Sequence, residues 1–466
     1  MKRVQFNPSI VVENGGTRLT SNAGAFLLRD VDDRLGMTRD LSRRLVDDRH
    51  PGTVFSMAEL TRTLLYLPAQ GFSDLDDGDL LRHDPAFRLA VSDKKGTRPL
   101  DDNGHGLPSQ PTLSRALHRL GSDDNRAVLA SVLRERAIAV RAKKARQRFC
   151  VVDVDSLPVE VHGHQKGSAY NGHYRIQMFH PLLATLGDDG DFVGVKLRPG
   201  NVHTADGVAE FLAPILDDIN QADIADDVLL RVDAGFPCQD FFDLADHHRA
   251  KFVARIKNNS RLDEMAQPFL KRPVGRPPAE PRTFTHELTY KAGTWNKELR
   301  VVLAVQEPPE GELFFHHFWL VTNVGDKELD AAALVALYRQ RGTAESRFGD
   351  FMSTLQPHLS STVRINIEKP GARQPKQFTM VKDPEAANEA RLLLFALTAN
   401  LMRALKRVVA PIDDATRGLR RLVDRVLRCA ARVIVHARGI RFLVEGALGA
   451  TWPTLVEAIE REPQLA

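Results

Sequence analysis

A polar stripe on one late helix constrains this chain more than any other feature. Segment 332–350 reads as a helix, and Tyr338, Arg341 and Glu345 follow one another along it at spacings of three and four residues. Residues at these spacings share one face of a helix. A phenol, a guanidinium and a carboxylate in one row indicate a helix whose polar face contributes to a site.

In each of two earlier segments, a run of apolar, β-branched residues ends in aspartate. Segment 150–157 contains Asp153 and Asp155, and segment 229–236 contains Asp233. Such runs predict buried strands, so the carboxylates stand at or near strand ends. Buried acids are costly unless a cation or an arginine compensates them. The alternatives are an edge strand with its polar face in water for the first pair and a helix cap for Asp233.

Length and composition are those of a large folded protein. The 466 residues suffice for two or three domains, and 43% hydrophobic with 27% charged residues is typical of globular chains. No apolar run is long enough for a membrane helix, and residues 1–30 lack the apolar segment of a signal peptide. We therefore expect a cytoplasmic protein without membrane contact. The three cysteines are too few and too scattered for a disulfide framework.

Positive charge is concentrated late in the chain. Between Leu401 and Phe442 there are eleven Lys or Arg residues and three aspartates, although the net charge of the whole chain is only +4. A polyanionic partner explains this local excess. A solvated basic helix face on a large enzyme is the alternative.

Residues 1–145 read as a helical N-terminal region. Its last part includes segment 111–121, a helix opened by proline and closed by glycine that shows Arg115 and Arg119 to solvent. This pattern is compatible with a DNA-binding module of helix-turn-helix type. It is equally compatible with a plain helical domain.

Residues 146–257 change to alternating strands and helices. The strand-like runs are 148–155, 174–186, 192–198, 228–233 and 251–256, and the helix-like segments are 205–219 and 237–248. Segment 187–191 has the composition of a hairpin loop. Three antiparallel strands, a helix and then alternating strands and helices is the order of a ribonuclease-H-like α/β fold. The expected fold class is a mixed sheet with flanking helices.

Three further parts complete the expected organisation. Residues 258–316 read as a β-rich insertion, with strand candidates at 285–290, 298–306 and 313–323. The last of these returns to the core sheet and opens the second part of the core, residues 317–383, which carries Glu345. Residues 384–466 read as a helical, basic C-terminal region.

Convergence of Asp155, Asp233 and Glu345 would create a site for two Mg²⁺ ions. Such ions activate a water or a 3′-hydroxyl and stabilise the oxygen that leaves a scissile phosphate. Carboxylates suit Mg²⁺ because it prefers hard oxygen ligands, and Mn²⁺ can substitute. Tyr338 and Arg341 would then lie within reach of the neighbouring phosphates. For Tyr338, packing on the core is the alternative.

The combination of motifs resembles the DDE transposases of bacterial insertion sequences. The resemblance covers residues from about 5 to 445 and points to the thirteen-eighty family, in the group that carries a Tyr-Arg-Glu-Lys signature. The matching motifs are Asp153-Val-Asp-Ser, Val161-His-Gly-His-Gln, Tyr174 to His180-Pro-Leu, Arg198-Pro-Gly-Asn, Arg231-Val-Asp-Ala-Gly-Phe and Tyr338-x2-Arg341-x3-Glu345.

This resemblance implies a function, a cofactor and a set of partners. It implies Mg²⁺-dependent cutting and joining at terminal inverted repeats, with double-stranded DNA as end and target, a homodimer in the DNA complex, and association with the nucleoid. Asp155, Asp233 and Glu345 are the implied catalytic and metal-binding acids, and Asp153 is the alternate to Asp155. Tyr338 and Arg341 are the implied DNA contacts.

One position departs from the family signature. The signature lysine corresponds to Met352, with Asp350 nearby, and Arg347 in the adjacent turn is a candidate substitute. A ribonuclease-H-superfamily nuclease that cuts without joining, and a catalytically decayed DNA-binding derivative, are therefore kept as alternatives.

The insertion offers two further candidate DNA contacts. Arg276 lies in a Gly-Arg-Pro segment like those of arms that enter A·T-rich minor grooves, with a rigid proline linker as the alternative. Trp295 is expected on an exposed turn, where it would stack on a base flipped out at the transposon end, as in similar transposases that form hairpin intermediates.

Overall fold

The computed structural model describes most of the chain. The described residues are 2–4, 7–12, 18–101, 106–161, 163, 165–272, 274–275, 278–310, 314–361, 383–413, 418–436, 439–445 and 449–465, with backbone alone for the first two ranges. Within these ranges, no helix combines the length and the apolar content needed to cross a membrane.

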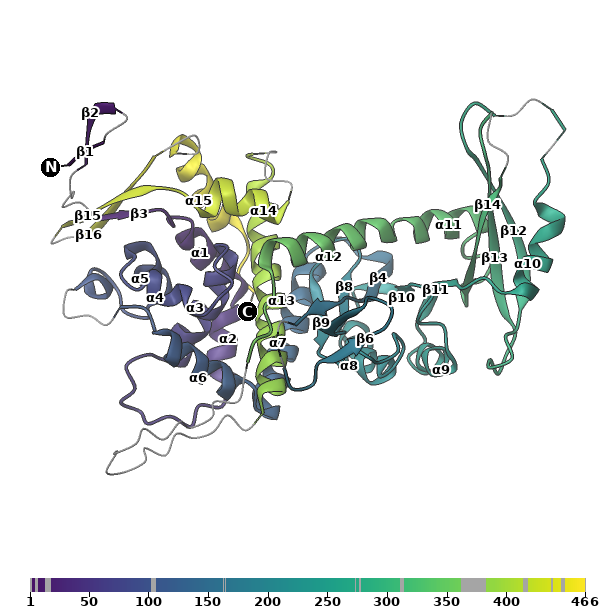
Figure 1. Ribbon diagram of the computed structural model, residues 1–466, viewed down its shortest axis with the longest axis horizontal. Helices are drawn as coiled ribbons and strands as arrows, with labels where there is room; N and C mark the ends of the chain where they lie inside the picture. The colour runs from purple at the N-terminus through teal and green to yellow at the C-terminus, as the bar shows by residue number, and fades with distance from the viewer. Residues whose placement is uncertain are drawn as a thin grey trace.

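An eight-stranded mixed sheet forms the centre of the molecule (Figure 1). Across the sheet the strands are β12 (Arg282–Tyr290), β13 (Leu299–Glu307), β14 (His316–Thr322), β11 (Lys251–Ile256), β10 (Ala225–Val232), β4 (Gln147–Ser156), β8 (Leu182–Leu186) and β9 (Phe192–Lys196). The three central strands β11, β10 and β4 are parallel, and the other neighbours are antiparallel. Parallel strands are covered on both faces, which explains the continuous apolar runs of β4 and β10.

Helices cover both faces of this sheet. Leu230 of β10 packs in the same core cluster as α8 (Val208–Ala222) and α9 (Gln239–His247). Its neighbour Leu229 packs in a different cluster with α11 (Ala331–Arg339). Successive side chains of a strand point to opposite faces, so α8 and α9 lie on one face and α11 on the other.

The predicted hairpin is confirmed, but the single strand predicted at 174–186 is wrong. Residues 187–191 do join β8 to β9 as antiparallel neighbours. The preceding run divides at His180 and Pro181 into β7 (Ile176–Phe179) and β8, because proline has no N–H to donate to a ladder. Strand β7 belongs to a small separate sheet with β5 (Val159–Glu160) and β6 (Ala169–Asn171).

The strands of the expected insertion extend the central sheet. Strand β14 pairs antiparallel with β11, and β13 and β12 follow outward. Figure 1 shows these long strands projecting from the end of the molecule farthest from the N-terminal helices. Short helices α10 (Ser260–Ala266) and η2 (Gln267–Phe269) precede them.

Trp295, between β12 and β13, does not lie on an exposed turn as predicted. Its side chain is 5% exposed, and its ring contacts Phe242 and Tyr290 with centroids 5.1 and 5.5 Å apart. The turn folds back onto the sheet because a large aromatic gains by burial. A base-stacking role would require this side chain to leave the core.

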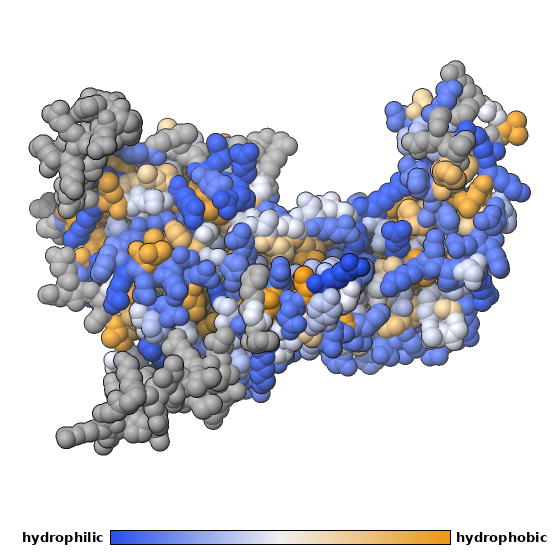
Figure 2. Space-filling model, in the orientation of Figure 1, coloured by the Kyte–Doolittle hydropathy of each residue, from blue (hydrophilic) through white to orange (hydrophobic). Residues whose placement is uncertain are grey.

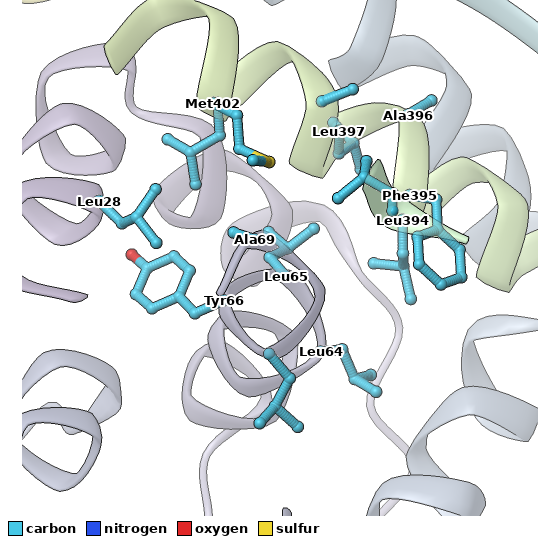
Figure 3. Close-up of a cluster of buried hydrophobic side chains, with 14 of the residues drawn as sticks. Leu28, Leu64, Leu65, Tyr66, Ala69, Leu394, Phe395, Ala396, Leu397 and Met402 are labelled. Atoms are coloured by element: carbon cyan, nitrogen blue, oxygen red, sulfur yellow. The ribbon is translucent and has the colours of Figure 1, made fainter. Parts of the chain in front are cut away.

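The long helix α13 (Pro384–Val409) is the centre of the remaining part of the chain. It packs against the N-terminal helices, and Figure 3 shows Leu65 of α3 on the side of that helix that faces Leu394 and Leu397 of α13, while Tyr66 points toward Leu28 of α1. The N-terminal helices are α1 (Ala25–Leu35), α2 (Met37–Arg44), α3 (Met57–Ala69), α4 (Asp77–Leu80), α5 (Pro85–Val91), η1 (Arg98–Leu100), α6 (Gln110–Leu120) and α7 (Asp123–Ala142).

The two terminal regions are not purely helical, contrary to the prediction. Strand β3 (Arg18–Thr20) pairs with β15 (Ala431–His436), which pairs with β16 (Gly439–Val444). The remaining elements are β1 (Lys2–Val4), β2 (Asn7–Val12), α14 (Leu419–Leu422), the π-helix η3 (Val423–Leu427), η4 (Gly449–Thr451) and α15 (Trp452–Arg461). The pairing joins segments about four hundred residues apart, which local sequence patterns do not reveal.

Candidate active site

The helix predicted at 332–350 is divided in two. Helix α11 ends at Arg339 and α12 (Arg341–Leu355) begins two residues later, with Gln340 between them. Tyr338 therefore lies at the end of α11, Arg341 opens α12, and Glu345 follows one turn later. The backbone of Gln340 stays helical, with φ −64° and ψ −12°, so the two helices continue almost in line (Figure 1).

The buried face of α12 holds it against the sheet. Phe348 and Phe351 pack on Phe192 of β9, with ring centroids 6.1 and 4.8 Å apart. All three rings are buried. Glu345 lies outside this face, and its side chain is 56% exposed. Packing of the apolar side therefore keeps the carboxylate of Glu345 accessible.

A buried arginine joins β4, β10 and the end of α11. The Arg231 guanidinium donates through Nε to Asp153 Oδ1 at 2.5 Å and through Nη2 to Oδ2 at 2.8 Å. Its Nη1 donates to the carbonyl of Leu337 at 2.7 Å. Arg231 thus satisfies a carbonyl in the last turn of α11, which otherwise has no helical partner. This contact places the α11–α12 junction over the ends of β4 and β10.

Strand register brings two of the predicted acids together. Asp153 of β4 is the register partner of Arg231 in the parallel strand β10. Asp155 and Asp233 each lie two residues further along, on the same side of the sheet and at the same end. Asp155 remains 14% exposed, whereas the Asp153 side chain is 2% exposed and fully engaged with Arg231.

Arg341 links the acid of β4 to the acid of α12. Its Nη2 donates to Asp155 Oδ2 at 2.8 Å, and its Nη1 donates to Glu345 Oε1. Asp233 lies close enough to interact electrostatically with both Asp155 and Arg341, while its own Oδ1 accepts from the backbone N–H of Gly235 at 2.8 Å. Two carboxylates, from β4 and α12, therefore pair with one guanidinium, and the carboxylate of Asp233, just after β10, lies near it.

The site carries more negative than positive charge. Burial raises the pKa of Asp155 to about 6, with Arg341 acting to lower it and the carboxylates of Asp233 and Glu345 acting to raise it. Burial also raises the pKa of Tyr338, and the charges of Asp233 and Glu345 add to that effect. A group of three acids and one arginine lacks positive charge, which a bound cation would supply.

The donor set fits a divalent metal ion in chemistry and charge. Three carboxylates offer the hard oxygen ligands that Mg²⁺ and Mn²⁺ prefer. Among the described residues, however, no three histidine, cysteine or acidic side chains are grouped closely enough to hold a metal as they stand. The guanidinium of Arg341 lies between two of the three acids.

Tyr174 and His180 border the acids, and the sequence reasoning gave them no role. Tyr174 lies on the β6–β7 hairpin tip, is 42% exposed, and has its ring centroid 6.1 Å from that of the buried His180. Burial raises the pKa of Tyr174, and the charges of Asp155 and Asp233 raise it further. The signal available was an aromatic and a histidine flanking a strand that leads to the acid-bearing sheet.

Arg231 was also missed as a positioning residue. Its sequence signal was an arginine inside the apolar run that leads to Asp233. A buried guanidinium in such a run demands a carboxylate partner, and Asp153 is that partner.

Two of the predicted DNA contacts have internal partners. Arg347 donates to the carbonyls of Gly187 and Asp188, the latter at 2.9 Å, and so holds the β8–β9 turn. In this structure its guanidinium is held by that turn, and its substitution for the signature lysine stays a prediction. Arg119 of α6 pairs with Asp48.

The side chains of the remaining predicted DNA contacts differ in how far they are exposed to solvent. Arg115 is exposed on α6 and donates to Thr112 Oγ1 at 3.2 Å. Tyr338 is partly buried beside Phe318, with ring centroids 6.5 Å apart, so it borders both the core and the site. Arg276 lies outside the described residues.

The basic C-terminal region is partly neutralised within the protein. Arg407 pairs with Asp191, Arg425 pairs with Asp413, and Arg420 pairs with Asp424. Arg428 donates to the carbonyls of Gln70 and Gly71. The excess of positive charge in the sequence therefore overstates the charge available to a partner.

Fold and site together define a mixed α/β protein with two aspartates at the ends of neighbouring central strands and a glutamate on the helix that crosses them. Residues 2–364 match the family model described as Transposase DDE domain group 1, and the chain belongs to this family of DDE transposases. Members of this family generally use divalent metal ions and act on DNA. No curated protein sequence matches the chain.

One solved structure with a similar outline is a piggyBac transposase synaptic complex with hairpin DNA, determined by cryo-electron microscopy. It shares 9% sequence identity with this chain, at a TM-score of 0.39. The match covers 86% of this chain and 78% of the other.

Proposed function

We propose that this protein is a DNA transposase of an insertion sequence, belonging to the thirteen-eighty family. It cuts at the terminal inverted repeats and joins the ends to target DNA by Mg²⁺-dependent phosphoryl transfer. The observation that carries the proposal is that Arg341 pairs with both Asp155 and Glu345, with Asp233 close enough to interact electrostatically with Asp155 and Arg341.

The order and direction of the core strands support a ribonuclease-H-like core. Strands β4, β8 and β9 are antiparallel neighbours, and β10 and β11 follow in parallel after helices α8 and α9. This is the order expected for that fold, and β12 to β14 then extend the sheet before the helix with Glu345.

Within this core, Asp155, Asp233 and Glu345 are the residues that would hold the metal ions. Bound divalent ions supply Lewis-acid stabilisation and an activated oxygen nucleophile at neutral pH. The chain itself supplies positioning. The Asp153–Arg231 pair fixes β4, β10 and α11 relative to one another, and the aromatic face of α12 fixes the height of Glu345 above the sheet.

DNA has a suitable place on the surface above these residues. Figure 2 shows the molecule hollowed along its upper edge, between the N-terminal region and the projecting strands β12 to β14. Figure 1 places α11 and α12 along the floor of this hollow. We infer that a DNA end lies there, along α11 and α12, and that a homodimer brings two ends together.

Substitution of single acids tests the proposed function. With Mg²⁺ and a labelled inverted-repeat end, Asp233→Asn and Glu345→Gln should each lower the cleavage rate by more than about 100-fold, beyond what outer-sphere partners of a metal contribute. DNA binding, measured by gel shift in Ca²⁺, should change little. The matched control is Glu264→Gln, an exposed acid of α10, which should cleave like the parent. Cleavage by the two site variants at the parental rate would exclude the proposal.

A catalytically decayed DNA-binding derivative is the second candidate, and Met352 favours it. This side chain stands at the signature lysine position and packs against the hydrophobic core. The same assay separates the candidates, because a decayed protein binds the DNA end without cutting it. Strand-transfer products into a target plasmid separate a transposase from a nuclease that only cuts.

A further inference from the structure

Within the described residues, the Arg341 guanidinium forms ion pairs with acids of the candidate site alone. Its side chain is 10% exposed, and its side-chain hydrogen bonds among the described residues go to the carboxylates of Asp155 and Glu345. Arg231 offers a contrast, because it is held by both oxygens of Asp153 and by the backbone carbonyl of Leu337. Arg231 is thus fixed by the framework, whereas Arg341 is fixed by the groups that would bind a metal.

The contacts of Arg341 compete with metal ligation. A guanidinium is a planar fork of N–H donors that can join two carboxylates at once. A carboxylate oxygen that accepts from the guanidinium cannot at the same time direct the same lone pair at a metal ion. Glu345 is 56% exposed and has room to turn, but Asp155 is only 14% exposed and has little. Asp155 Oδ1 also accepts from the backbone N–H of Ser156 at 2.9 Å, so a metal ion competes with Arg341 for the lone pairs of Asp155.

The released guanidinium needs another anion nearby. Its long side chain starts at the first residue of α12, along the floor of the hollow in Figure 2 where we place the DNA. A phosphate of the DNA backbone offers the same bidentate geometry as a carboxylate. Transfer of Arg341 from carboxylates to phosphate keeps the guanidinium paired throughout.

We propose that Arg341 is an internal counter-cation that holds Asp155 and Glu345 in the metal-free protein and moves to a DNA phosphate when metal ions bind. It is a positioning residue that couples the two binding events. This inference rests on the proposed function, because it requires metal and DNA at the same site. By linkage, DNA must tighten metal binding by the same factor by which metal tightens DNA binding, and such couplings are commonly about 5- to 150-fold.

Titration of the full-length protein with Mn²⁺ tests the coupling. Isothermal calorimetry without DNA should give a dissociation constant at least about fivefold lower for Arg341→Met than for the parent, because no cation has to be displaced. A short duplex that ends at the inverted-repeat terminus, and so offers nothing to cut, should tighten Mn²⁺ binding in the parent at least about fivefold more than in Arg341→Met.

Two further variants keep the test decisive. Arg339→Met removes an exposed arginine two residues away and should behave like the parent. Arg341→Lys keeps the charge but offers one nitrogen in place of the fork, so its Mn²⁺ affinity should lie between those of the parent and Arg341→Met. Circular dichroism confirms that each variant is folded, and the metal-free Arg341→Met protein should melt at a lower temperature and gain more from Mn²⁺.

The outcomes separate this inference from the proposed function. Equal or weaker Mn²⁺ binding by folded Arg341→Met, or an equal effect of DNA on both proteins, overturns the role of Arg341 and leaves the transposase proposal standing. Mn²⁺ binding at the proposed site should be abolished by Asp233→Asn. If neither the parent nor either Arg341 variant shows such binding, the metal site is overturned, and the proposed function with it.

Discussion

Asp153 and Asp155 show how surroundings give two identical side chains different roles. Both lie on one face of β4, and each meets an arginine. Asp153 is deep inside and shares its two oxygens with Arg231, while Asp155 lies at the strand end beside two other acids. Burial with a committed partner suits a structural role, and partial exposure in a group of acids suits a cation site.

This difference predicts opposite effects of the two amide variants. Asp153→Asn leaves the buried charge of Arg231 without its partner and should lower the free energy of unfolding by about 3–5 kcal/mol. Asp155→Asn should cost clearly less, because the remaining acids still pair with Arg341. Urea unfolding of the metal-free proteins measures both, and an equal cost for the two variants would contradict this division of roles. Replacing Asp153 and Arg231 together by Leu and Met should recover most of the loss.

At the level of elements, one buried carboxylate ties three N-terminal helices together. Asp32 of α1 accepts from the backbone N–H and the hydroxyl of Thr38 at 2.9 and 2.7 Å, and from the hydroxyl of Tyr66 at 2.6 Å. These donors belong to α2 and α3. Burial raises the pKa of Asp32, while the hydrogen bonds act to lower it. The net effect makes this helix junction sensitive to pH.

The sign of that sensitivity follows from linkage. Above the pKa of an unfolded aspartate, about 4, the folded state keeps a proton on Asp32 that the unfolded state loses. Its contribution to stability is present below that value and is lost as the pH rises through the raised pKa. The free energy of unfolding of the parent minus that of Asp32→Asn should therefore fall as the pH rises above about 4, by no more than about 1.4 kcal/mol per pH unit.

Urea unfolding of the parent and of Asp32→Asn at several pH values above about 4 measures this difference in the free energy of unfolding. The matched control is Asp124→Asn, at an exposed position of α7, whose difference from the parent should stay nearly flat. A difference for Asp32→Asn that rises with pH would have the wrong sign.

For the whole molecule, α13 joins the N-terminal helices to the acid-bearing sheet. Nearly all of its residues are buried. Asn400 accepts from the backbone N–H of Phe192 at 2.7 Å and donates to its carbonyl at 2.9 Å, which fastens α13 to β9. Phe192 is also the residue on which α12 packs. The position of Glu345 thus depends indirectly on the C-terminal part of the chain.

We predict that the sheet and its own helices are not stable without α13. A fragment of residues 146–361 exposes the apolar surface that α13 covers on β9 and α12, so it should bind a hydrophobic dye and unfold without a cooperative transition. In the full chain, Asn400→Ala should cost about 1–3 kcal/mol, because two buried backbone groups lose their partner. Cooperative melting of the fragment with a native-like circular dichroism spectrum would contradict the prediction.

Local sequence determined much of the architecture and was enough to predict which acids form the candidate site. Runs of apolar, β-branched residues located most of the core strands and the β8–β9 hairpin, and the aspartates at the ends of β4 and β10 were visible as breaks in these runs. The polar stripe with Glu345 was equally visible. These features depend on residues within one turn or one strand, so their physical causes are readable in a short window.

Only the tertiary structure decided which partners these residues have. Asp153 with Arg231, Arg341 with Asp155, Trp295 in its aromatic pocket and β3 against β15 all join segments separated in the chain. Ion pairs, burial and strand pairing depend on distance in space, and no local periodicity encodes it. The sequence predicted the acids of the candidate site. The packing of α12 and α13 on the sheet placed an arginine between two of them.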